Sequence, residues 1–118
     1  MIPFIDLKSQ YKRVQEKINK RMMAVLDHGQ YIMGPEVAEL EGILAKYVGS
    51  KHCIAVSSGT DAQMMALMAL GVGPGDEVVV PDFSFFATAE VVLLVHATPV
   101  FVDVDPKTYN MDPKLLEK

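Results

Sequence analysis

The chain has 118 residues, of which 50% are hydrophobic, and its formal net charge is −4. This length allows one domain with a hydrophobic core, and an acidic chain without a basic stripe is not expected to bind nucleic acid. The single cysteine, Cys53, excludes an internal disulfide and fits a reducing cytoplasm. No apolar run is long enough to cross a membrane. The three histidines lack the spacing of metal ligands.

Two amphipathic helices are predicted at the start of the sequence. The first carries an apolar stripe at steps of three and four residues, formed by Leu7, Tyr11, Val14, Ile18, Met22 and Val25. It should end near His28 and Gly29, and the second helix should run from Pro35 to Gly49, because proline suits the first helical turn and glycine the residue after the last. The second stripe consists of Val37, Leu40, Leu44 and Tyr47. We expect both helices to pack on a large domain or on a second subunit.

A short strand is predicted to lead into a third helix through a turn of small residues. Residues 52–56 ("HCIAV") are apolar or β-branched and indicate a buried strand, and a helical pattern begins at Thr60. The turn "SSGT" between them should present unpaired backbone N–H groups and the positive end of the helix dipole, which favours an anion such as phosphate. The alternative is that the serine is only an N-cap and the glycine only eases the turn.

Two further strands and a helix follow in alternation. The patterns predict a strand over Glu77–Pro81, a helix within residues 82–97 and a strand over Pro99–Asp105. This order predicts an α/β fold with a mostly parallel sheet flanked by helices, and the run of valines at 78–80 is typical of a strand covered on both faces.

The C-terminal segment indicates a structure larger than this chain. Asp112 and Pro113 are a favourable N-cap and first helical residue, yet only five residues follow them. Three strands are also few for a sheet with helices on both faces. We therefore expect residues 1–118 to be the N-terminal part of a longer protein, the alternative being a small protein with a frayed end.

Six segments together resemble one enzyme family. They are residues 4–11 ("FIDLKSQY"), 29–41 ("GQYIMGPEVAELE"), 57–62 ("SSGTDA"), 71–81 ("GVGPGDEVVVP"), 84–90 ("SFFATAE") and 101–113 ("FVDVDPKTYNMDP"). In this order they are similar to the DegT/DnrJ/EryC1/StrS family of pyridoxal-phosphate-dependent aminotransferases of nucleotide-linked keto sugars, and especially to enzymes that aminate a 3-keto UDP-N-acetylglucosaminuronate for surface-polysaccharide synthesis. The resemblance implies the N-terminal portion of the large domain of a fold-type I transferase, acting as a homodimer with active sites at the subunit interface.

The resemblance also implies cofactor contacts. In the family a Gly-Thr turn holds the phosphate of pyridoxal 5'-phosphate, which here corresponds to Gly59 and Thr60, with the Asp61 amide nearby and the Ser58 hydroxyl beside it. An aromatic residue that follows a serine or threonine stacks on the pyridine ring, and that position is Phe85.

Some phenylalanines and aspartates of the chain have alternative interpretations, and two catalytic groups of the family are expected downstream. From the residues alone, Phe83, Phe85 and Phe86 are interpreted as core side chains at a helix start, and Phe83 and Phe86 keep this interpretation when the resemblance is considered. Asp103 and Asp105 are interpreted as strand-end and turn residues, with a cofactor role as the alternative. The family's Schiff-base lysine and the acidic partner of the pyridine nitrogen are expected downstream, and the lysines of this chain are expected on helix surfaces, turns and the tail.

The functional hypothesis is therefore an aminotransferase that moves an amino group, from a donor such as glutamate, to a keto carbon of a nucleotide sugar. By itself, the chain is expected to be inactive because the catalytic lysine lies downstream. One alternative is a sugar dehydrase of the same fold with histidine in place of the lysine, and another is a non-catalytic binding or assembly module.

Overall fold

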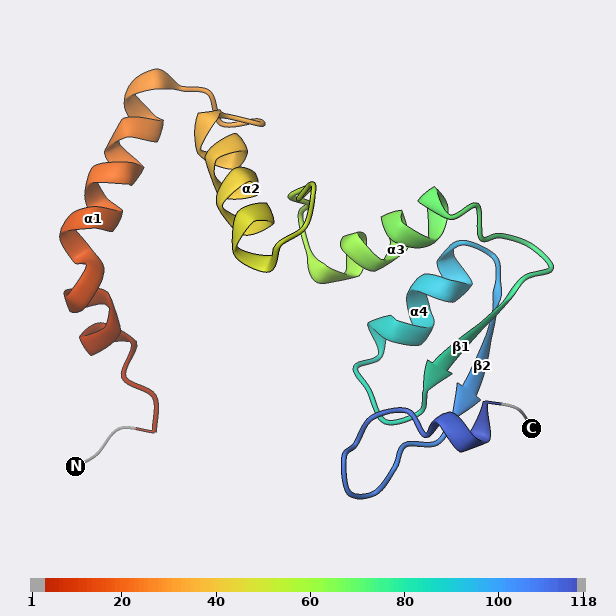
Figure 1. The fold of residues 1–118 in the computed structure, drawn as a ribbon. Coiled ribbons are helices and arrows are strands. Elements are labelled where there is room, and N and C mark those ends of the chain that lie inside the picture. Colours follow the sequence, from red (N-terminus) through yellow and green to blue (C-terminus); the bar gives the residue numbers. More distant parts are fainter. Residues whose placement is uncertain (1–3, 117–118) are drawn as a thin grey trace. The chain divides into compact units, whose positions relative to one another are not determined.

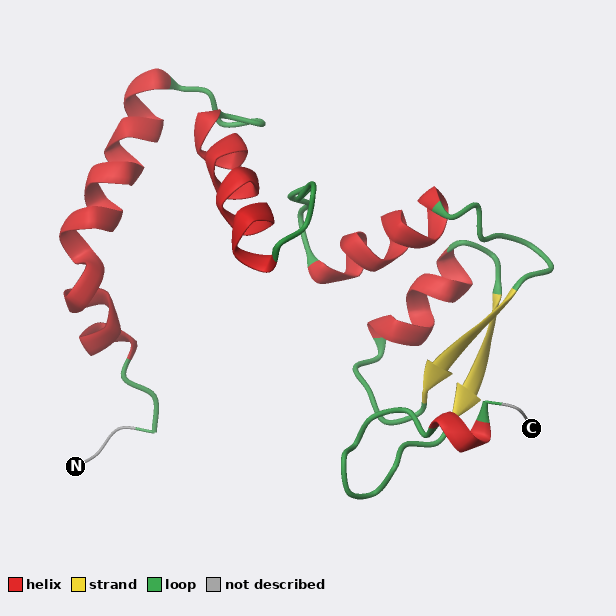
Figure 2. Ribbon diagram, in the orientation of Figure 1, coloured by secondary structure: helices red, strands yellow, loops and turns green. Residues whose placement is uncertain are grey.

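The structure, a computed structural model, describes residues 4–116, and the chain divides into two compact units, Met1–Ala55 and Val56–Lys118. The helices are α1 (Leu7–His28), α2 (Pro35–Val48), α3 (Gly59–Ala69) and α4 (Ala87–Leu94), with a short 3-10 helix, η1 (Pro113–Leu115) (Figure 1). The strands are β1 (Glu77–Pro81) and β2 (Thr98–Val102) (Figure 2).

The first unit contains the two predicted amphipathic helices. α1 is capped by Asp6, whose carboxylate accepts a hydrogen bond from the Ser9 amide at 3.0 Å, and it ends at Gly29, which has φ 68°. α2 begins at Pro35 and ends before Gly49, which has φ 71°. The predicted bounds of both helices are confirmed.

Two side-chain pairs connect α1 to α2. Arg21 pairs with Glu39, and His28 Nε2 lies 3.2 Å from Glu36 Oε2. No residue of either helix is buried. The expectation that both apolar stripes pack on a larger surface therefore stays a prediction.

The strand predicted over residues 52–56 is wrong. This segment has no regular secondary structure, and the side chain of Ile54 is 76% exposed. A strand requires hydrogen bonds to a neighbouring strand, and no strand among residues 4–116 pairs with this segment. The Ala55 amide instead donates to Glu41 Oε1 of α2 at 2.7 Å.

The second unit is built on a parallel pair of strands joined through α4. β1 pairs with β2 in the register Glu77↔Thr98 to Pro81↔Val102. The α/β arrangement with a parallel sheet is confirmed. β1 has the predicted bounds, whereas β2 begins one residue earlier than predicted and ends at Val102 instead of Asp105.

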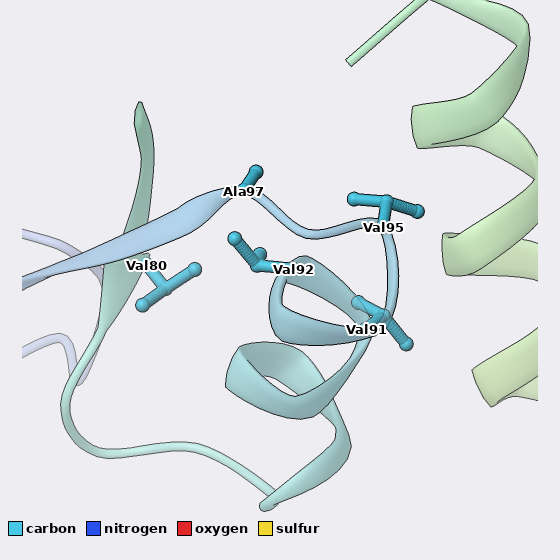
Figure 3. Close-up of a cluster of buried hydrophobic side chains, with 5 residues drawn as sticks. All are labelled: Val80, Val91, Val92, Val95 and Ala97. Carbon is cyan, nitrogen blue, oxygen red and sulfur yellow. The ribbon is translucent and has the colours of Figure 1, made fainter. Parts of the chain in front are cut away.

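The core of this unit lies between α4 and one face of the strands. Its buried residues are Val80, Val91, Val92, Val95 and Ala97 (Figure 3). Side chains alternate between the two faces of a strand, and Val79, next to Val80, is 42% exposed. The prediction that residues 78–80 are covered on both faces is therefore wrong for Val79.

The segment after β2 is held by aspartate side chains. Asp103 Oδ1 accepts a hydrogen bond from the Val104 amide at 2.7 Å, and Asp105 Oδ1 accepts from the amides of Lys107 at 2.9 Å and Thr108 at 3.0 Å. These are the turn contacts predicted for the two aspartates. The Asp112 side chain caps η1, so the predicted helix start is confirmed, although only as one 3-10 turn.

Within residues 4–116, no helix combines the length and the apolar character that a membrane crossing requires. The same residues contain no group of three or more histidine, cysteine, aspartate or glutamate side chains placed to hold a metal ion.

Candidate functional site

The junction before α3 has the turn that the sequence predicted. Ser58 is extended, with φ −157° and ψ 167°, and the helix begins at Gly59. The Ser58 Oγ accepts a hydrogen bond from the Asp61 amide at 3.1 Å, so Ser58 is an N-cap. The interpretation of this serine as a helix cap is confirmed.

Two backbone amides at this helix start are available to a ligand. The Asp61 amide is bonded to the Ser58 hydroxyl, and the Ala62 amide donates to the Ser58 carbonyl at 3.0 Å. The amides of Gly59 and Thr60 make no hydrogen bond to any other group in the described part of the chain. An anion at this point would therefore meet two free donors and the positive end of the helix dipole.

Asp61 holds a negative charge next to these donors. Its carboxylate accepts hydrogen bonds from the Ser57 hydroxyl and from the Ser58 hydroxyl, the latter at 2.9 Å. These two bonds, the one from Ser57 first, lower the pKa of Asp61 below its ordinary value, and desolvation opposes them only in part. The ionised carboxylate suits the helix N-terminus but repels an anion. The hydrogen bonds of Ser58 and Asp61 stabilise the turn, and their contact with the cofactor stays a prediction.

We expect Ser57→Ala to raise the pKa of Asp61, because it removes the hydroxyl that lowers this pKa most. A folded-state pKa below 3.8 means that ionised Asp61 stabilises the fold above pH 3.8, and that this contribution is lost as the pH falls through the folded-state pKa. An NMR titration of the Asp61 carboxyl carbon measures the change. Asp105, whose pKa is lowered by the amides of Lys107 and Thr108, should titrate as before. An unchanged Asp61 titration would contradict the assignment.

A pocket of about 290 Å³ brings the helix start together with the aromatic segment. It is lined by Gly59, Thr60, Gln63, Phe85, Ala87 and Thr88. Its volume is just below the range of about 300–1,000 Å³ that is typical of small-molecule sites. Of the residues predicted to bind the cofactor, the structure thus places Gly59, Thr60 and Phe85 around one cavity, and it leaves Ser58 and Asp61 outside the lining.

Phe85 is not a core residue in this structure. Its side chain is 79% exposed, and those of Phe83 and Phe86 are 67% and 71% exposed. Phe83 packs instead on Tyr109, with the ring centroids 5.7 Å apart. The alternative that all three phenylalanines are core residues is therefore wrong, and of the three only Phe85 lines this pocket.

Gln63 and Thr88 are pocket residues that the sequence analysis missed. Gln63 follows Thr60 by three residues, which places both on one face of α3. This spacing is the sequence feature that could have identified Gln63 as a pocket residue. The Thr88 hydroxyl lies 3.0 Å from the Ser84 hydroxyl. The link between α3 and α4 that places Thr88 in the pocket is tertiary and leaves no local pattern.

No lysine of the described chain lines this pocket, and all lysines among residues 4–116 are exposed. Lys118 lies outside the described residues. The described residues therefore provide donors for an anion and an aromatic face for a ring, but no amine that could bond covalently to a ligand in the pocket.

The family model of the DegT/DnrJ/EryC1/StrS aminotransferase family matches residues 12–118. The chain belongs to this family. It is 60% identical over 117 residues to the UDP-2-acetamido-2-deoxy-3-oxo-D-glucuronate aminotransferase of Pseudomonas aeruginosa, an alignment that covers 99% of this chain and 33% of that protein. The chain thus spans about a third of the length of this curated relative.

Two solved structures of the family have the same fold over nearly the whole chain. A DegT/DnrJ/EryC1/StrS aminotransferase from Brucella abortus matches with a TM-score of 0.94 and 53% identity, covering 99% of this chain and 31% of that one. NtdA from Bacillus subtilis, solved with bound cofactor PMP, matches with a TM-score of 0.90 and 38% identity, covering 98% and 27%. At these identities, the neighbours support both the fold and the family.

Proposed function

We propose that the protein is a pyridoxal-phosphate-dependent aminotransferase that moves an amino group, from a donor such as glutamate, to a keto carbon of a nucleotide-linked sugar. Residues 1–118 would form the N-terminal portion of its cofactor-binding large domain. Family membership and the 60% identity to an aminotransferase of a UDP-linked 3-oxo sugar support this proposal. The single observation that carries it is the pocket shared by Gly59, Thr60 and Phe85.

These residues fit a cofactor that carries both a phosphate and an aromatic ring. The free amides of Gly59 and Thr60 would hold the phosphate, and the exposed Phe85 ring would cover one face of the pyridine. When bound, this cofactor supplies the carbonyl group and the electron-withdrawing ring through which the amino group is carried. The role of Phe85 is to fix the plane of that ring, which is an orientation effect in catalysis.

The proposal also covers the substrate, the cellular location and the oligomeric state of the enzyme. The P. aeruginosa relative acts on a UDP-linked sugar acid, which favours a UDP-sugar substrate and a role in surface-polysaccharide synthesis. The single cysteine fits a cytoplasmic protein. The exposed apolar stripes of α1 and α2 need a partner surface, which supports a homodimer.

The reaction can be tested in the reverse direction. The full-length protein is given a UDP-linked 3-amino sugar acid, pyridoxal phosphate and 2-oxoglutarate, and the formation of glutamate and of the 3-keto sugar is followed by mass spectrometry. Equal amounts of both products support the proposal. Loss of water from the sugar without amino transfer would identify the dehydrase alternative, and binding without turnover would identify a non-catalytic module.

We expect Phe85→Ala to weaken pyridoxal phosphate binding about fivefold, since a stacked aromatic pair contributes on the order of 1 kcal/mol beyond area burial. The fold should persist because Phe85 is exposed. Equilibrium dialysis of the cofactor-free protein measures the affinity. Phe83→Ala, which removes a similarly exposed ring outside the pocket, is the matched control and should bind as the wild type does. Equal affinities for the two variants would remove Phe85 from the site.

We expect the 118-residue chain to have no transaminase activity. When it is treated with pyridoxal phosphate and borohydride, no lysine should be labelled stoichiometrically. A covalent bond requires an amine held against the cofactor aldehyde in a pocket, and no lysine among residues 4–116 lines the candidate pocket. Peptide mapping after reduction measures the extent of labelling at each lysine. Labelling of one lysine in a one-to-one ratio would contradict the assignment of these residues to cofactor binding alone.

A further inference from the structure

Thr88 makes a hydrogen bond on each side of Phe85, the residue whose ring lines the candidate pocket. The Thr88 hydroxyl lies 3.0 Å from the Ser84 hydroxyl, and the Thr88 amide donates to the Phe85 carbonyl at 3.0 Å. The first bond holds the residue before Phe85, and the second holds Phe85 itself. Together they restrain the backbone on both sides of the Phe85 Cα, and the backbone limits the directions in which a side chain can point.

Thr88 belongs to the part of α4 that packs on the strands. Val91 and Val92 follow it by three and four residues, so the three side chains lie on one side of the helix. The two valines are 3% and 1% exposed and belong to the buried cluster (Figure 3). Ala87, which precedes Thr88, is also buried. Because a packed core leaves its members little freedom to move, Thr88 connects the Phe85 segment to a rigid part of the unit.

The contact between the two hydroxyls is not needed to begin α4. The Phe85 carbonyl accepts the Thr88 amide, and the Phe86 carbonyl accepts the Glu90 amide at 3.1 Å, so the first turn has its backbone bonds. A helical threonine commonly bonds its hydroxyl to a backbone carbonyl of the preceding turn. Here the Thr88 hydroxyl lies against the Ser84 side chain. This contact is therefore an additional restraint on the segment that presents the ring.

We propose that Thr88 is a positioning residue, which acts through Ser84 to hold the Phe85 ring at the angle at which it stacks on the cofactor. Stacking depends on the relative orientation of two rings, and a ring that swings freely spends less time in that orientation. This inference rests on the proposed function, because it requires that Phe85 cover the cofactor ring. Thr88 also lines the pocket, so the test has to separate this role from a direct contact with the phosphate.

The test measures the affinities of the cofactor-free, full-length protein for pyridoxal phosphate and for pyridoxal, which lacks the phosphate. Thr88→Val keeps the side-chain shape and removes the hydroxyl, and Ser84→Ala removes its partner. Each should weaken binding of both compounds equally, by about two- to threefold, as expected for one neutral hydrogen bond. The double variant should lose no more than either single variant, because all three lack the same bond. Thr98→Val changes an exposed threonine of β2 and should bind as the wild type does.

Three further measurements give results that a role in stability alone would not produce. Thr88→Ser restores the hydroxyl and should recover most of the affinity. Thr88→Val should cause no further loss when it is added to Phe85→Ala, because it acts through the ring that this variant lacks. The visible circular dichroism of the bound cofactor depends on how its ring is held, and should change in Thr88→Val and return in Thr88→Ser. Thermal unfolding shows whether each variant keeps the fold.

The inference and the proposed function fail in distinguishable ways. A loss for pyridoxal phosphate without a loss for pyridoxal would mean that Thr88 binds the phosphate directly, and would overturn the positioning role. A further loss in the Phe85→Ala background, or wild-type affinity in both Thr88→Val and Ser84→Ala, would also overturn it. If Phe85→Ala weakens binding in that last case, only the positioning role is wrong. If Phe85→Ala also has no effect, the stacking role proposed for Phe85 is wrong.

Discussion

Replacing Gly34 by alanine is expected to lower the free energy of unfolding of the α1–α2 unit by about 2 to 3 kcal/mol, the upper part of the range for overpacking. Gly34 is buried, and a Cβ built on it would lie 2.3 Å from the Gln30 carbonyl oxygen. Its φ of −67° is open to any residue, so the cost arises from this contact and not from the backbone angle.

The surrounding loop leaves little room to relieve that contact. The Gln30 amide donates to His28 Nδ1 at 3.0 Å, and the Val37 amide donates to the Gly34 carbonyl at 3.0 Å. The ring of His28 also lies against Glu36. Both ends of the Gln30–Gly34 segment are therefore held by hydrogen bonds, which oppose a shift of the Gln30 carbonyl.

Urea unfolding followed by circular dichroism measures the effect, and Gly42→Ala is the matched control. Gly42 lies inside α2, and its Cβ would meet nothing within 4 Å. The same substitution there should stabilise the unit by about 1 kcal/mol, because glycine is a poor helix former. Opposite signs for the two variants are expected, and stabilisation by both would show that the Gln30 carbonyl moves freely.

The helices of the first unit could be predicted because their signals are local. Pro35 and Gly49 mark the ends of α2 through their own backbone preferences, and the stripe of α1 follows from helical spacing alone. β1 was equally accessible, since its valine run is bounded by a glycine-rich turn and Pro81. These features need no knowledge of the rest of the fold.

The errors concern features that depend on a distant partner. Residues 52–56 have the composition of a strand, but composition does not supply the neighbouring strand to which their amides would bond. Val79 is exposed for a related reason, because α4 covers only the opposite face of β1. In both cases the local pattern describes what a residue prefers, and tertiary structure decides whether that preference is met.

The same distinction between local and tertiary features applies to the candidate site. The helix start is a local feature, predicted at Thr60 and observed one residue earlier, at Gly59. The N-cap role of Ser58, one of the two interpretations that the sequence offered, is confirmed by its hydrogen bonds with Asp61. A contact of Ser58 or Asp61 with the cofactor stays a prediction. Phe85 and Thr88 reach the pocket only through the packing of α4 beside α3.

Gly59→Pro is expected to weaken pyridoxal phosphate binding on the order of 10- to 100-fold. Proline removes one of the two free amide donors, and a hydrogen bond to a charged group contributes about 1.5 to 3 kcal/mol. The helix should tolerate this change, since Gly59 is the first residue of α3, where proline is favourable. Ser58 is already extended, at ψ 167°, which is the conformation required before proline.

Gly59→Ala separates the lost amide from the added side chain. A Cβ at Gly59 meets no protein atom within 4 Å, and alanine keeps the N–H. This variant should therefore bind pyridoxal phosphate much more tightly than the proline variant, while both unfold at similar denaturant concentrations. The backbone amide, and not the absence of a side chain, would then be what position 59 contributes to the phosphate site. Equal losses in the two variants would instead mean that glycine is needed for space, with the phosphate lying against the Cα and held by other donors.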